Sequence, residues 1–359
     1  MLLNIIIIII GFVLLIKGAD FLVDGASEIA KKFHIPEIVI GLTIVAIGTS
    51  MPELVVSVTS AIEGHSDLAI GNVVGSNIAN MFFILGACSI IKPLVFKKET
   101  RLFEIPYTIF VTVLLFILCI NGNGEEINII TRKEGIILLA FCVLFIIYNL
   151  IMAKKGGEFE NAEKILEIRT EGKKEVPVWE SLFGIIMGII GLKLGGDLVV
   201  NNSVEIAKGL GISEKLISLT IVAFSTSLPE LITSIAATKK GETDMAIGNI
   251  LGSQIFNILL IIGTSAVLTP INYSKSYDSN IILLIIGSIV LGMFPFVGKK
   301  NQMSRANGIT FVLTYIAYIV GIVLYAWIDV DIKLTSCYKI LNSLEKIKSF
   351  LYNINIKIK

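Results

Sequence analysis

The stretch TIVAIGTSMPEL at residues 43–54 occurs a second time, as TIVAFSTSLPEL, at residues 220–231. Each copy lies inside a long apolar run and carries one acidic side chain, Glu53 in the first copy and Glu230 in the second. A carboxylate at membrane depth is costly, and such residues usually mark a functional site. The duplicated carboxylate is therefore the first candidate for function in this chain.

The composition is that of a membrane protein. Hydrophobic residues make up 54% of the chain and charged residues 16%, with a mean hydropathy of +0.84, which is far more apolar than an ordinary soluble domain. We expect an all-α polytopic protein of the plasma membrane, surrounded by the lipid bilayer. Its charges are segregated into loops and form no single basic face, which argues against a nucleic-acid partner. No obligatory protein partner is evident.

The N-terminus and the cysteines add little beyond this class. The initial run MLLNIIIIII lacks a basic segment and is followed by no clear cleavage site, so it predicts a retained first transmembrane helix and no signal peptide. The four cysteines are scattered along the chain and predict neither a disulfide framework nor a zinc site. No motif indicates an enzyme or a bound cofactor.

Apolar stretches of spanning length, bounded by charged or turn-forming residues, predict about ten transmembrane helices. They lie at residues 3–24, 36–62, 68–92, 102–120, 134–152, 180–202, 213–238, 243–268, 279–297 and 307–328. The polar interval after the fifth stretch divides them five and five and is typical of a linker. We expect a first transmembrane repeat at residues 1–153, a cytoplasmic linker at 154–178, a second repeat at 179–328 and a polar, basic tail at 329–359.

The two halves align at a constant offset of 177 residues, the separation of Glu53 and Glu230. A second block, AIGNVVGSNIAN at residues 69–80, matches AIGNILGSQIFN at residues 246–257 at the same offset. An odd number of spans in each half makes the second half enter the membrane upside down. The sequence therefore predicts two inverted five-helix repeats.

The distribution of basic residues predicts the orientation. With the N-terminus outside, most lysines and arginines fall in inner loops, and the outer loops hold only Arg132, Lys133, Lys208, Lys215 and Lys275. We expect both termini outside and the linker in the cytoplasm. The tail opposes this assignment, because it carries six lysines, but late charges bias topology less than early ones.

The first repeated block supplies oxygen ligands. Pro52 removes a backbone donor and should interrupt the helix, which would leave carbonyls near Ala46 free to face a cavity. Thr49, Ser50 and Glu53 add hydroxyl and carboxylate oxygens within about one turn. Such oxygen-only ligand sets suit hard cations such as Ca2+ and Na+, whereas zinc and copper call for His or Cys.

The second block completes the predicted cage. Ser76 and Asn80 are four residues apart, as are Ser253 and Asn257, so each pair shares one helix face. Brought together near the bilayer midplane, the two sets would make one site with two carboxylates and a ring of neutral oxygens. One divalent ion or several monovalent ions can neutralise two negative charges, and bound cations would then permit the site to change its facing.

The paired blocks, GTSxPE and GNxxGSxxxN in the first repeat, resemble the alpha repeats of the sodium/calcium exchanger family, within the cation/calcium antiporter superfamily. The resemblance covers both repeats and the ten-helix plan, and the short linker is similar to the minimal prokaryotic form. It implies an antiporter that exchanges Na+ for Ca2+ by alternating access. The ion ligands that it implies are Glu53, Glu230, Thr49, Thr226, Ser50, Ser227, Ser76, Ser253, Asn80, Asn257 and the backbone carbonyls of Ala46 and Ala223.

Three positions depart from the pattern. Ser225 stands where the first repeat has Gly48, and Ser218 where it has Gly41, so we expect the second hinge to be stiffer or hydrogen-bonded differently. Asn257 is neutral where some relatives, including potassium-dependent exchangers, carry Asp. The amide argues against potassium cotransport and against a third titratable carboxylate.

Other polar residues of the repeats have structural interpretations. We expect Ser57 and Ser234 to bond to their own helix or to a neighbouring one. Asp20 and its repeat equivalent Asp197 lie near lysines, Lys17 in the first case. Structural pairing or capping is favoured for these two residues over a role in transport.

Three other functions are alternatives to Na+/Ca2+ exchange. A proton/calcium exchanger, or an exchanger of another divalent cation, would use the same carboxylates, although the hydroxyl-rich frame favours sodium. A passive cation channel is disfavoured by inverted repeats around a single midplane site. An intramembrane protease would need an acid/base pair, but no Asp-based protease motif accompanies the two glutamates.

Overall fold

The architecture is a bundle of helices joined by two short sheets. The computed structural model describes residues 2–120, 127–156, 176–209, 223–297 and 301–324. The chain divides into two compact units, Met1–Val312 and Leu313–Lys359, and the arrangement below is that of the first unit. Across the described ranges, eight helices are long and apolar enough to cross a membrane, and a bent helix pair is a ninth candidate span. The predicted all-α polytopic class is confirmed.

The spanning helices follow the apolar stretches because, in lipid, each backbone polar group must be bonded within the protein. The first half contains α1 (Leu2–Lys32), α2 (Glu37–Ile40), the π-helical segment η1 (Gly41–Val45), α3 (Ala46–Thr49), α4 (Met51–Ile62), α5 (Ser66–Ile78), η2 (Ala79–Ile84), α6 (Leu85–Ile91), η3 (Thr100–Glu104), α7 (Ile105–Cys119) and α8 (Arg132–Gly156). The second half contains α10 (Val178–Gly209), α12 (Ala223–Ser225), α13 (Leu228–Lys240), α14 (Thr243–Phe256), η5 (Asn257–Ile262), α15 (Gly263–Leu268), η6 (Lys275–Tyr277), α16 (Asp278–Met293), η7 (Phe294–Phe296) and a helix at Arg305–Leu324.

The elements of the two halves correspond at the offset found in the sequence. Shifted by 177 residues, the first residues of α4 and α5 coincide with Leu228 and Thr243, where α13 and α14 begin. The π-helical segments η2 and η5 also correspond, to within one residue. The internal repeat of the sequence is therefore a repeat of structure.

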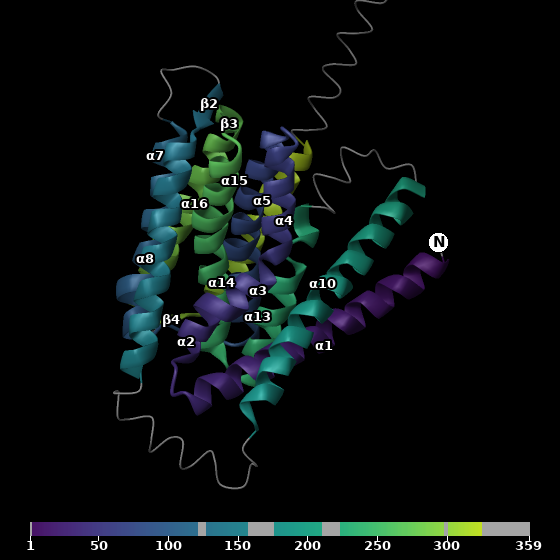
Figure 1. Ribbon diagram of the computed structural model, residues 1–359, viewed down its shortest axis with the longest axis vertical. Helices are drawn as coiled ribbons and strands as arrows, with labels where there is room; N and C mark the ends of the chain where they lie inside the picture. The colour runs from purple at the N-terminus through teal and green to yellow at the C-terminus, as the bar shows by residue number, and fades with distance from the viewer. Residues whose placement is uncertain (1, 121–126, 157–175, 210–222, 298–300, 325–359) are drawn as a thin grey trace, which may run out of the picture. The chain divides into compact units, whose positions relative to one another are not determined.

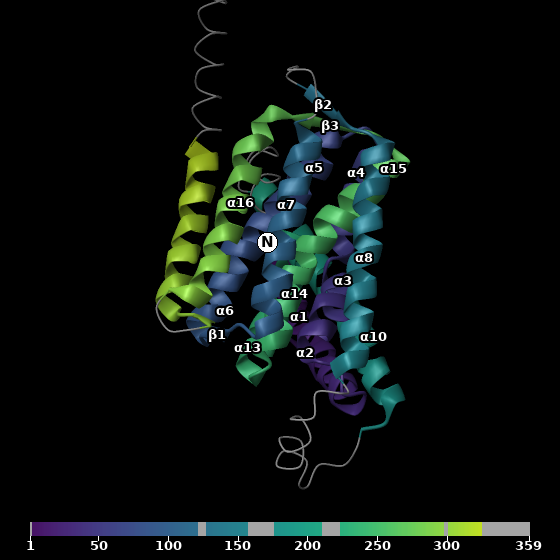
Figure 2. The ribbon, with the colours of Figure 1, turned by 90° about the vertical axis from the view of Figure 1, so that its left-hand side faces the viewer.

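Two small antiparallel sheets link the halves. Strand β1 (Leu94–Val95) pairs with β4 (Gln302–Met303), and β2 (Ile127–Ile130) pairs with β3 (Ile271–Ser274). In each sheet, the strand that follows the third span of one half pairs with the strand that precedes the fifth span of the other half. The sheets lie at opposite ends of the bundle (Figure 1, Figure 2). Two halves of opposite orientation give this arrangement.

The equivalent helices α1 and α10 lie side by side, inclined to the other helices (Figure 1). Glycines allow the two backbones to approach closely. A Cβ atom added at Gly18 would lie 2.7 Å from the nitrogen of Leu192, and one added at Gly188 would lie 2.6 Å from the nitrogen of Leu22. Contact of this kind is a common basis of helix packing in membranes, and a larger side chain at either glycine would push the helices apart.

Some predicted boundaries differ from the structure. Helix α1 continues to Lys32, beyond the predicted end at residue 24, because small residues in its last turns, such as Ala26 and Ala30, are buried. The predicted seventh span at 213–238 is described from Ala223 onward. Most of the predicted linker, and all of the predicted tail, lie outside the described residues.

Candidate ion-binding site

Each repeated TSxPE stretch forms a break between two helices. Helix α3 ends at Thr49, Ser50 leaves the helical conformation (φ −85°, ψ 8°), and α4 begins at Met51. The segments before and after Ser50 are bent by 50° relative to each other. In the second half, Ser227 has nearly the same conformation (φ −88°, ψ 4°) just before α13. The predicted interruption is confirmed, and a proline without an N–H fits the first turn of each following helix.

The prediction of free carbonyls near Ala46 does not hold for the Ala46 carbonyl itself. This carbonyl accepts the Ser50 backbone N–H at 3.0 Å and the Thr49 hydroxyl at 3.3 Å. Pro52 removes a donor only from the carbonyl four residues before it, which belongs to Gly48. Ala46 could therefore bind a cation only by giving up one of these two hydrogen bonds.

Glu53 and Glu230 lie in the first turns of α4 and α13, and only 1% and 0% of their surfaces are exposed. The two carboxylates are close enough for their charges to interact. The Ser50 hydroxyl donates to Oε1 of Glu230 at 2.8 Å. In contrast, the Ser227 hydroxyl and both oxygens of Glu53 have no hydrogen-bond partner among the described residues. The two halves meet at these carboxylates. Glu230 accepts a hydrogen bond from the serine of the other half, and Glu53 does not.

The two asparagines of the second block lie at the start of π-helical segments. Asn80 is the second residue of η2, and Asn257 is the first residue of η5. A π-helical turn shifts the face that follows it and is frequent at functional sites. The Asn257 amide nitrogen donates to Oδ1 of Asn77 at 3.0 Å, so its own oxygen is left for another partner. In the part of the chain that is described, Oδ1 of both Asn80 and Asn257 is buried without a partner.

The unpartnered oxygens come from both repeats. Among the described residues they include both carboxylate oxygens of Glu53, Oε2 of Glu230, Oδ1 of Asn80 and Asn257, and the hydroxyls of Ser227 and Ser253. A buried polar group left unsatisfied costs about 1–3 kcal/mol, and a charged group costs more. Since cations bind through oxygen lone pairs, a cation could satisfy several members of this set at once.

The predicted ligand residues are all buried where their side chains are described, and Ala223 is the one residue whose side chain is not described. The Thr226 and Ser76 hydroxyls lie 3.4 Å apart and next to Glu53. Thr49 lies next to Glu230. No group of three His, Cys, Asp or Glu side chains is placed to bind a metal within the described ranges. The candidate site therefore combines two carboxylates with neutral oxygens.

Two residues of the site were missed by the sequence analysis. Asn72 Oδ1 accepts the Thr226 hydroxyl at 3.2 Å, and Asn249 Oδ1 accepts the Thr49 hydroxyl at 3.1 Å. Both asparagines are buried and occupy equivalent positions in the repeated AIGN sequence. Their equivalent positions in the two repeats were the one sign in the sequence that these asparagines belong to the site. Which threonine each asparagine contacts depends on how the halves pack.

The other polar residues of the repeats make structural contacts. Ser57 and Ser234 each accept a hydrogen bond from an asparagine of the neighbouring helix, which confirms the prediction for these serines. Asp20 is paired, as predicted, but its partner is Lys240 at 3.1 Å and not the nearby Lys17. That lysine is far away in sequence, at the end of α13, so spacing alone could not identify it.

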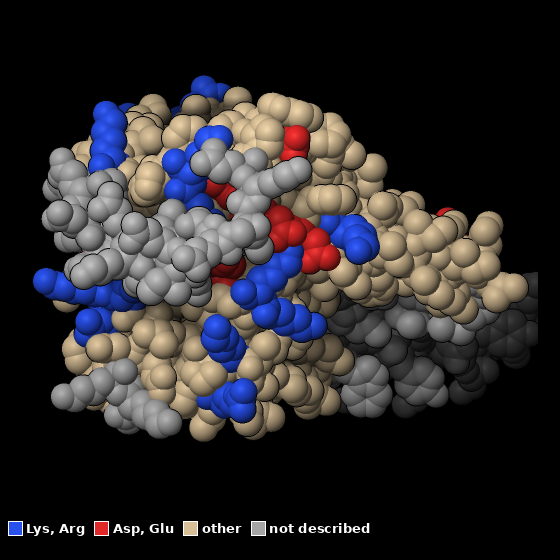
Figure 3. Space-filling view, turned by 90° about the horizontal axis from the view of Figure 1, so that it is seen from below, with Lys and Arg blue, Asp and Glu red and all other residues tan. Residues whose placement is uncertain are grey.

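The end of the bundle that carries β1 and β4 is rich in charge (Figure 3). Lys97 forms an ion pair of 2.5 Å with Asp244, and Glu37 and Glu242 interact with each other close by. Lysines and arginines surround a group of acidic residues on this face (Figure 3). The concentration of basic residues here is typical of a cytoplasmic membrane surface.

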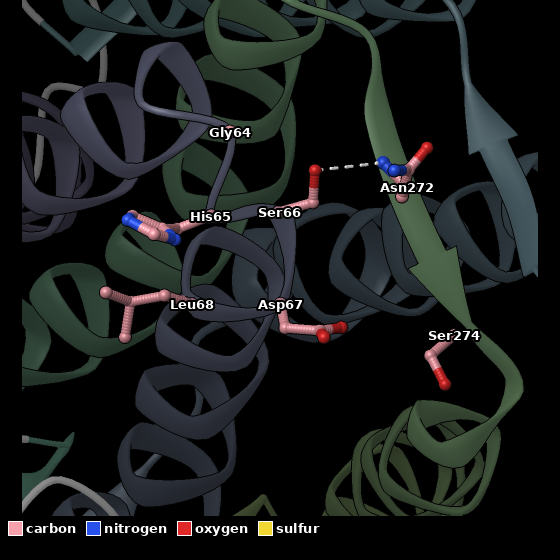
Figure 4. Close-up of a pocket in the computed structure, with 7 residues that line it drawn as sticks. All are labelled: Gly64, His65, Ser66, Asp67, Leu68, Asn272 and Ser274. Carbon is pink, nitrogen blue, oxygen red and sulfur yellow. Dashed lines mark hydrogen bonds between the residues drawn. The ribbon is translucent and has the colours of Figure 1, made fainter.

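A surface pocket lies at the opposite end of the bundle, between the α4–α5 turn and β3. It is lined by Gly64, His65, Ser66, Asp67, Leu68, Asn272 and Ser274 (Figure 4). The Ser66 hydroxyl accepts the backbone N–H of Asn272 at 3.1 Å (Figure 4). None of the predicted ion ligands lines this pocket, so the buried oxygens form a separate feature.

Spanning helices in two inverted halves, with a buried cluster of oxygens shared between the halves, define a polytopic membrane transporter of the inverted-repeat type. The pattern of the sodium/calcium exchanger protein family matches residues 3–151 and 180–324 of this chain. The chain therefore belongs to the sodium/calcium exchanger protein family.

Individual relatives agree with this assignment over nearly their whole length. The chain is 36% identical over 320 residues to a putative antiporter, CaxA, of Alkalimonas amylolytica, a match that covers 89% of this chain and 98% of that protein. It is 30% identical over 347 residues to the sodium/calcium exchanger MaX1 of Methanosarcina acetivorans, with coverage of 88% and 97%. A solved structure of the sodium-calcium exchanger NCX_Mj, soaked with zero Na+ and Ca2+, is similar with a TM-score of 0.75 and 32% identity, covering 89% of this chain and 99% of that one.

Proposed function

We propose that the protein is an antiporter that exchanges Na+ for Ca2+ at the site formed around Glu53 and Glu230. The observation that carries this proposal is the set of buried, unpartnered oxygens contributed by both repeats. The names of the relatives MaX1 and NCX_Mj support the same pair of ions. The ligands proposed beside the two carboxylates are Thr49, Thr226, Ser50, Ser227, Ser76, Ser253, Asn80, Asn257 and, after loss of a hydrogen bond, the carbonyl of Ala46 together with that of Ala223.

Charge neutralisation links ion binding to movement of the site. Each buried carboxylate without a counter-ion costs several kcal/mol. For comparison, removing one partner of a buried ion pair costs about 3–5 kcal/mol. One Ca2+, or at least two Na+, removes the net charge of Glu53 and Glu230. The loaded site can therefore be closed off from water in the low-dielectric centre of the membrane far more readily than the empty site.

Exchange follows because both ions need the same oxygens. Ca2+ must leave before Na+ can occupy its ligands, so the site carries one kind of ion in each direction. The inverted halves support alternating access, in which the two repeats exchange conformations and open the site first to one side and then to the other. We also propose that the N-terminus lies outside and the linker in the cytoplasm, which is supported by the basic end of the bundle.

Reconstitution tests the proposal. Purified protein in liposomes loaded with Na+ should accumulate 45Ca2+ when the outer Na+ is removed, and uptake should stop when Na+ is equal on both sides. Valinomycin with equal K+ on both sides holds the membrane potential at zero, so uptake then reports the Na+ gradient alone. Uptake driven only by a pH gradient would identify a proton/calcium exchanger instead. Calcium flux that needs no counter-ion would identify a channel.

A further inference from the structure

Asn249 connects a threonine of the first repeat to a serine of the second. Its Oδ1 atom accepts the Thr49 hydroxyl at 3.1 Å, and its Nδ2 atom donates to the Ser234 hydroxyl oxygen at 2.9 Å. All three side chains have 0% of their surface exposed. The amide is thus held at both ends. The Thr49 hydroxyl has a second acceptor in the Ala46 carbonyl oxygen at 3.3 Å, and the Asn249 oxygen is the nearer of the two.

Asn72 makes the equivalent connection in the opposite direction. Its Oδ1 atom accepts the Thr226 hydroxyl of the second repeat at 3.2 Å, and its Nδ2 atom donates to Ser57 of the first repeat at 3.0 Å. Nδ2 also lies 3.4 Å from the backbone oxygen of Glu53. The two relays therefore match at the 177-residue offset in partners and, to within 0.1 Å, in the two principal distances.

The relays end beside the two carboxylates. Thr49, of the first repeat, lies next to Glu230 of the second, and Thr226, of the second repeat, lies next to Glu53 of the first. A hydroxyl carries one hydrogen and two lone pairs, and a cation can bind only to a lone pair. When the hydrogen points to an asparagine oxygen, the lone pairs remain for a cation between the carboxylates.

We propose that Asn72 and Asn249 are positioning residues that hold the Thr226 and Thr49 hydroxyls with their lone pairs available to the transported cation. This inference rests on the proposed function, since it concerns the same site. Each asparagine orients a ligand that belongs to the other half, so ion binding in one repeat depends on the packing of both repeats.

The hydrogen bonds at the two carboxylates differ between the halves, whereas the relays have the same partners in both. Ser50 donates to Glu230, whereas the Ser227 hydroxyl makes no such bond to Glu53 among the described residues. The relays are equal in both halves although the bonds at the carboxylates are not. They therefore form a fixed frame around ligands whose own contacts differ.

A double-mutant cycle tests the proposal. Apparent dissociation constants for Ca2+ and for Na+ are measured on the full chain in detergent from the rise of Tm with ion concentration, for wild type, Asn249→Leu, Thr49→Val and the double variant. We expect each single change to weaken binding about tenfold, the effect of one lost hydrogen bond of typical strength. The double variant should bind no more weakly than Thr49→Val, because Asn249 acts through Thr49.

The controls separate positioning from packing. Asn149 is a buried asparagine of α8 that bonds to its own helix, to the Phe145 oxygen at 2.8 Å, so Asn149→Leu should leave both ion constants unchanged. Unchanged constants in Asn249→Leu, with only a lower Tm in the absence of ions, would overturn the proposal. Additive losses in the double variant, about a hundredfold in total, would overturn it as well.

A second cycle keeps the test decisive if Asn249→Leu does not fold. The changes Asn72→Leu and Thr226→Val address the equivalent relay and should show the same lack of additivity. Additive losses there would contradict the proposal for both relays. If the wild type binds neither Ca2+ nor Na+, the proposed function is refuted instead. The variants would then have been tested with ions that the site does not bind.

Discussion

The Ser50 hydroxyl of the first repeat donates a hydrogen bond of 2.8 Å to Oε1 of Glu230 in the second repeat. The equivalent pair, Ser227 and Glu53, has no such bond among the residues described. The two halves have the same Ser and Glu at these positions, so the difference arises from conformation. In an inverted-repeat transporter the halves adopt different conformations in any one facing, and each exchanges its role with the other during transport.

This inequality predicts different stabilities for two alanine variants. A hydrogen bond to a charged group contributes about 1.5–3 kcal/mol. Ser50→Ala should therefore lower the Tm of the ion-free protein, whereas Ser227→Ala should leave it nearly unchanged. Both variants should weaken ion binding, because both serines are proposed ligands. Thermal unfolding with and without Ca2+ measures both effects, and an equal fall in ion-free Tm would contradict the asymmetry.

The carboxylates themselves give the most direct prediction. Glu53→Gln and Glu230→Gln each remove one of the two charges that a divalent ion must neutralise, while keeping nearly the same shape. Each should abolish Na+-dependent 45Ca2+ uptake in liposomes, although the protein still inserts and elutes as a folded species. Undiminished uptake by either variant would remove that carboxylate from the mechanism.

A control is available in another membrane-spanning segment. Glu104 is also buried, with 2% of its surface exposed, and lies in η3. Its equivalent in the second half is Ile281, so it has no counterpart with which to share an ion. Glu104→Gln should keep uptake within about twofold of wild type, a change of less than roughly 0.5 kcal/mol. Loss of uptake there would mean that any buried carboxylate is required, whatever its place.

Much of the fold could be predicted because its signals are local. Apolar runs of membrane length mark the spans, and the constant offset between Glu53 and Glu230 marks the repeat. The break before Pro52 also follows from one residue's missing N–H. What the sequence could not show depends on contacts between distant segments, such as the exchange of strands between the halves.

In the site too, features that depend on neighbouring residues could be predicted, and contacts between distant residues could not. The residue types of the repeated blocks predicted an oxygen-rich cluster, and all the side chains that are described are buried there. The bonded state of the Ala46 carbonyl was missed, because Thr49 and Ser50 supply donors that the proline rule does not consider. The contact of Asn249 with Thr49 was missed because these residues lie in different halves.

Close packing around the site predicts a strong effect of a single methyl group. A Cβ atom at Gly248 would lie 2.5 Å from the Ile38 oxygen and 2.9 Å from the Leu42 nitrogen. Because both contacts are with backbone, Gly248→Ala should destabilise the protein by about 1–3 kcal/mol and lower its Tm. At Gly292 the nearest atom would be a side-chain carbon of Ile105 at 3.5 Å, so Gly292→Ala is the control. Equal Tm values for the two variants would contradict the packing argument.

The ion pairs of Lys240 predict a structural role for Asp20. Lys240 lies 3.1 Å from Asp20 and 2.8 Å from Asp24, and its side chain is 30% exposed. Ion pairs with this exposure contribute at most about 1 kcal/mol each. Asp20→Asn should therefore lower Tm slightly and leave the apparent constants for Ca2+ and Na+ unchanged. A changed ion constant, measured from the rise of Tm with ion concentration, would instead place Asp20 on the transport path.

The proposed orientation predicts opposite labelling of the two ends of the bundle. Asp67 and Lys98 are exposed and lie at the ends that carry β3 and β1 respectively. The described cysteines are buried, so a chain with Cys337→Ser is a suitable parent for single-cysteine variants. A membrane-impermeant maleimide applied to intact cells should label Asp67→Cys and not Lys98→Cys, and both should react after permeabilisation. The parent should remain unlabelled. Because the basic residues near Lys98 favour the cytoplasmic side, the reverse pattern would place the N-terminus inside and invert the proposed topology.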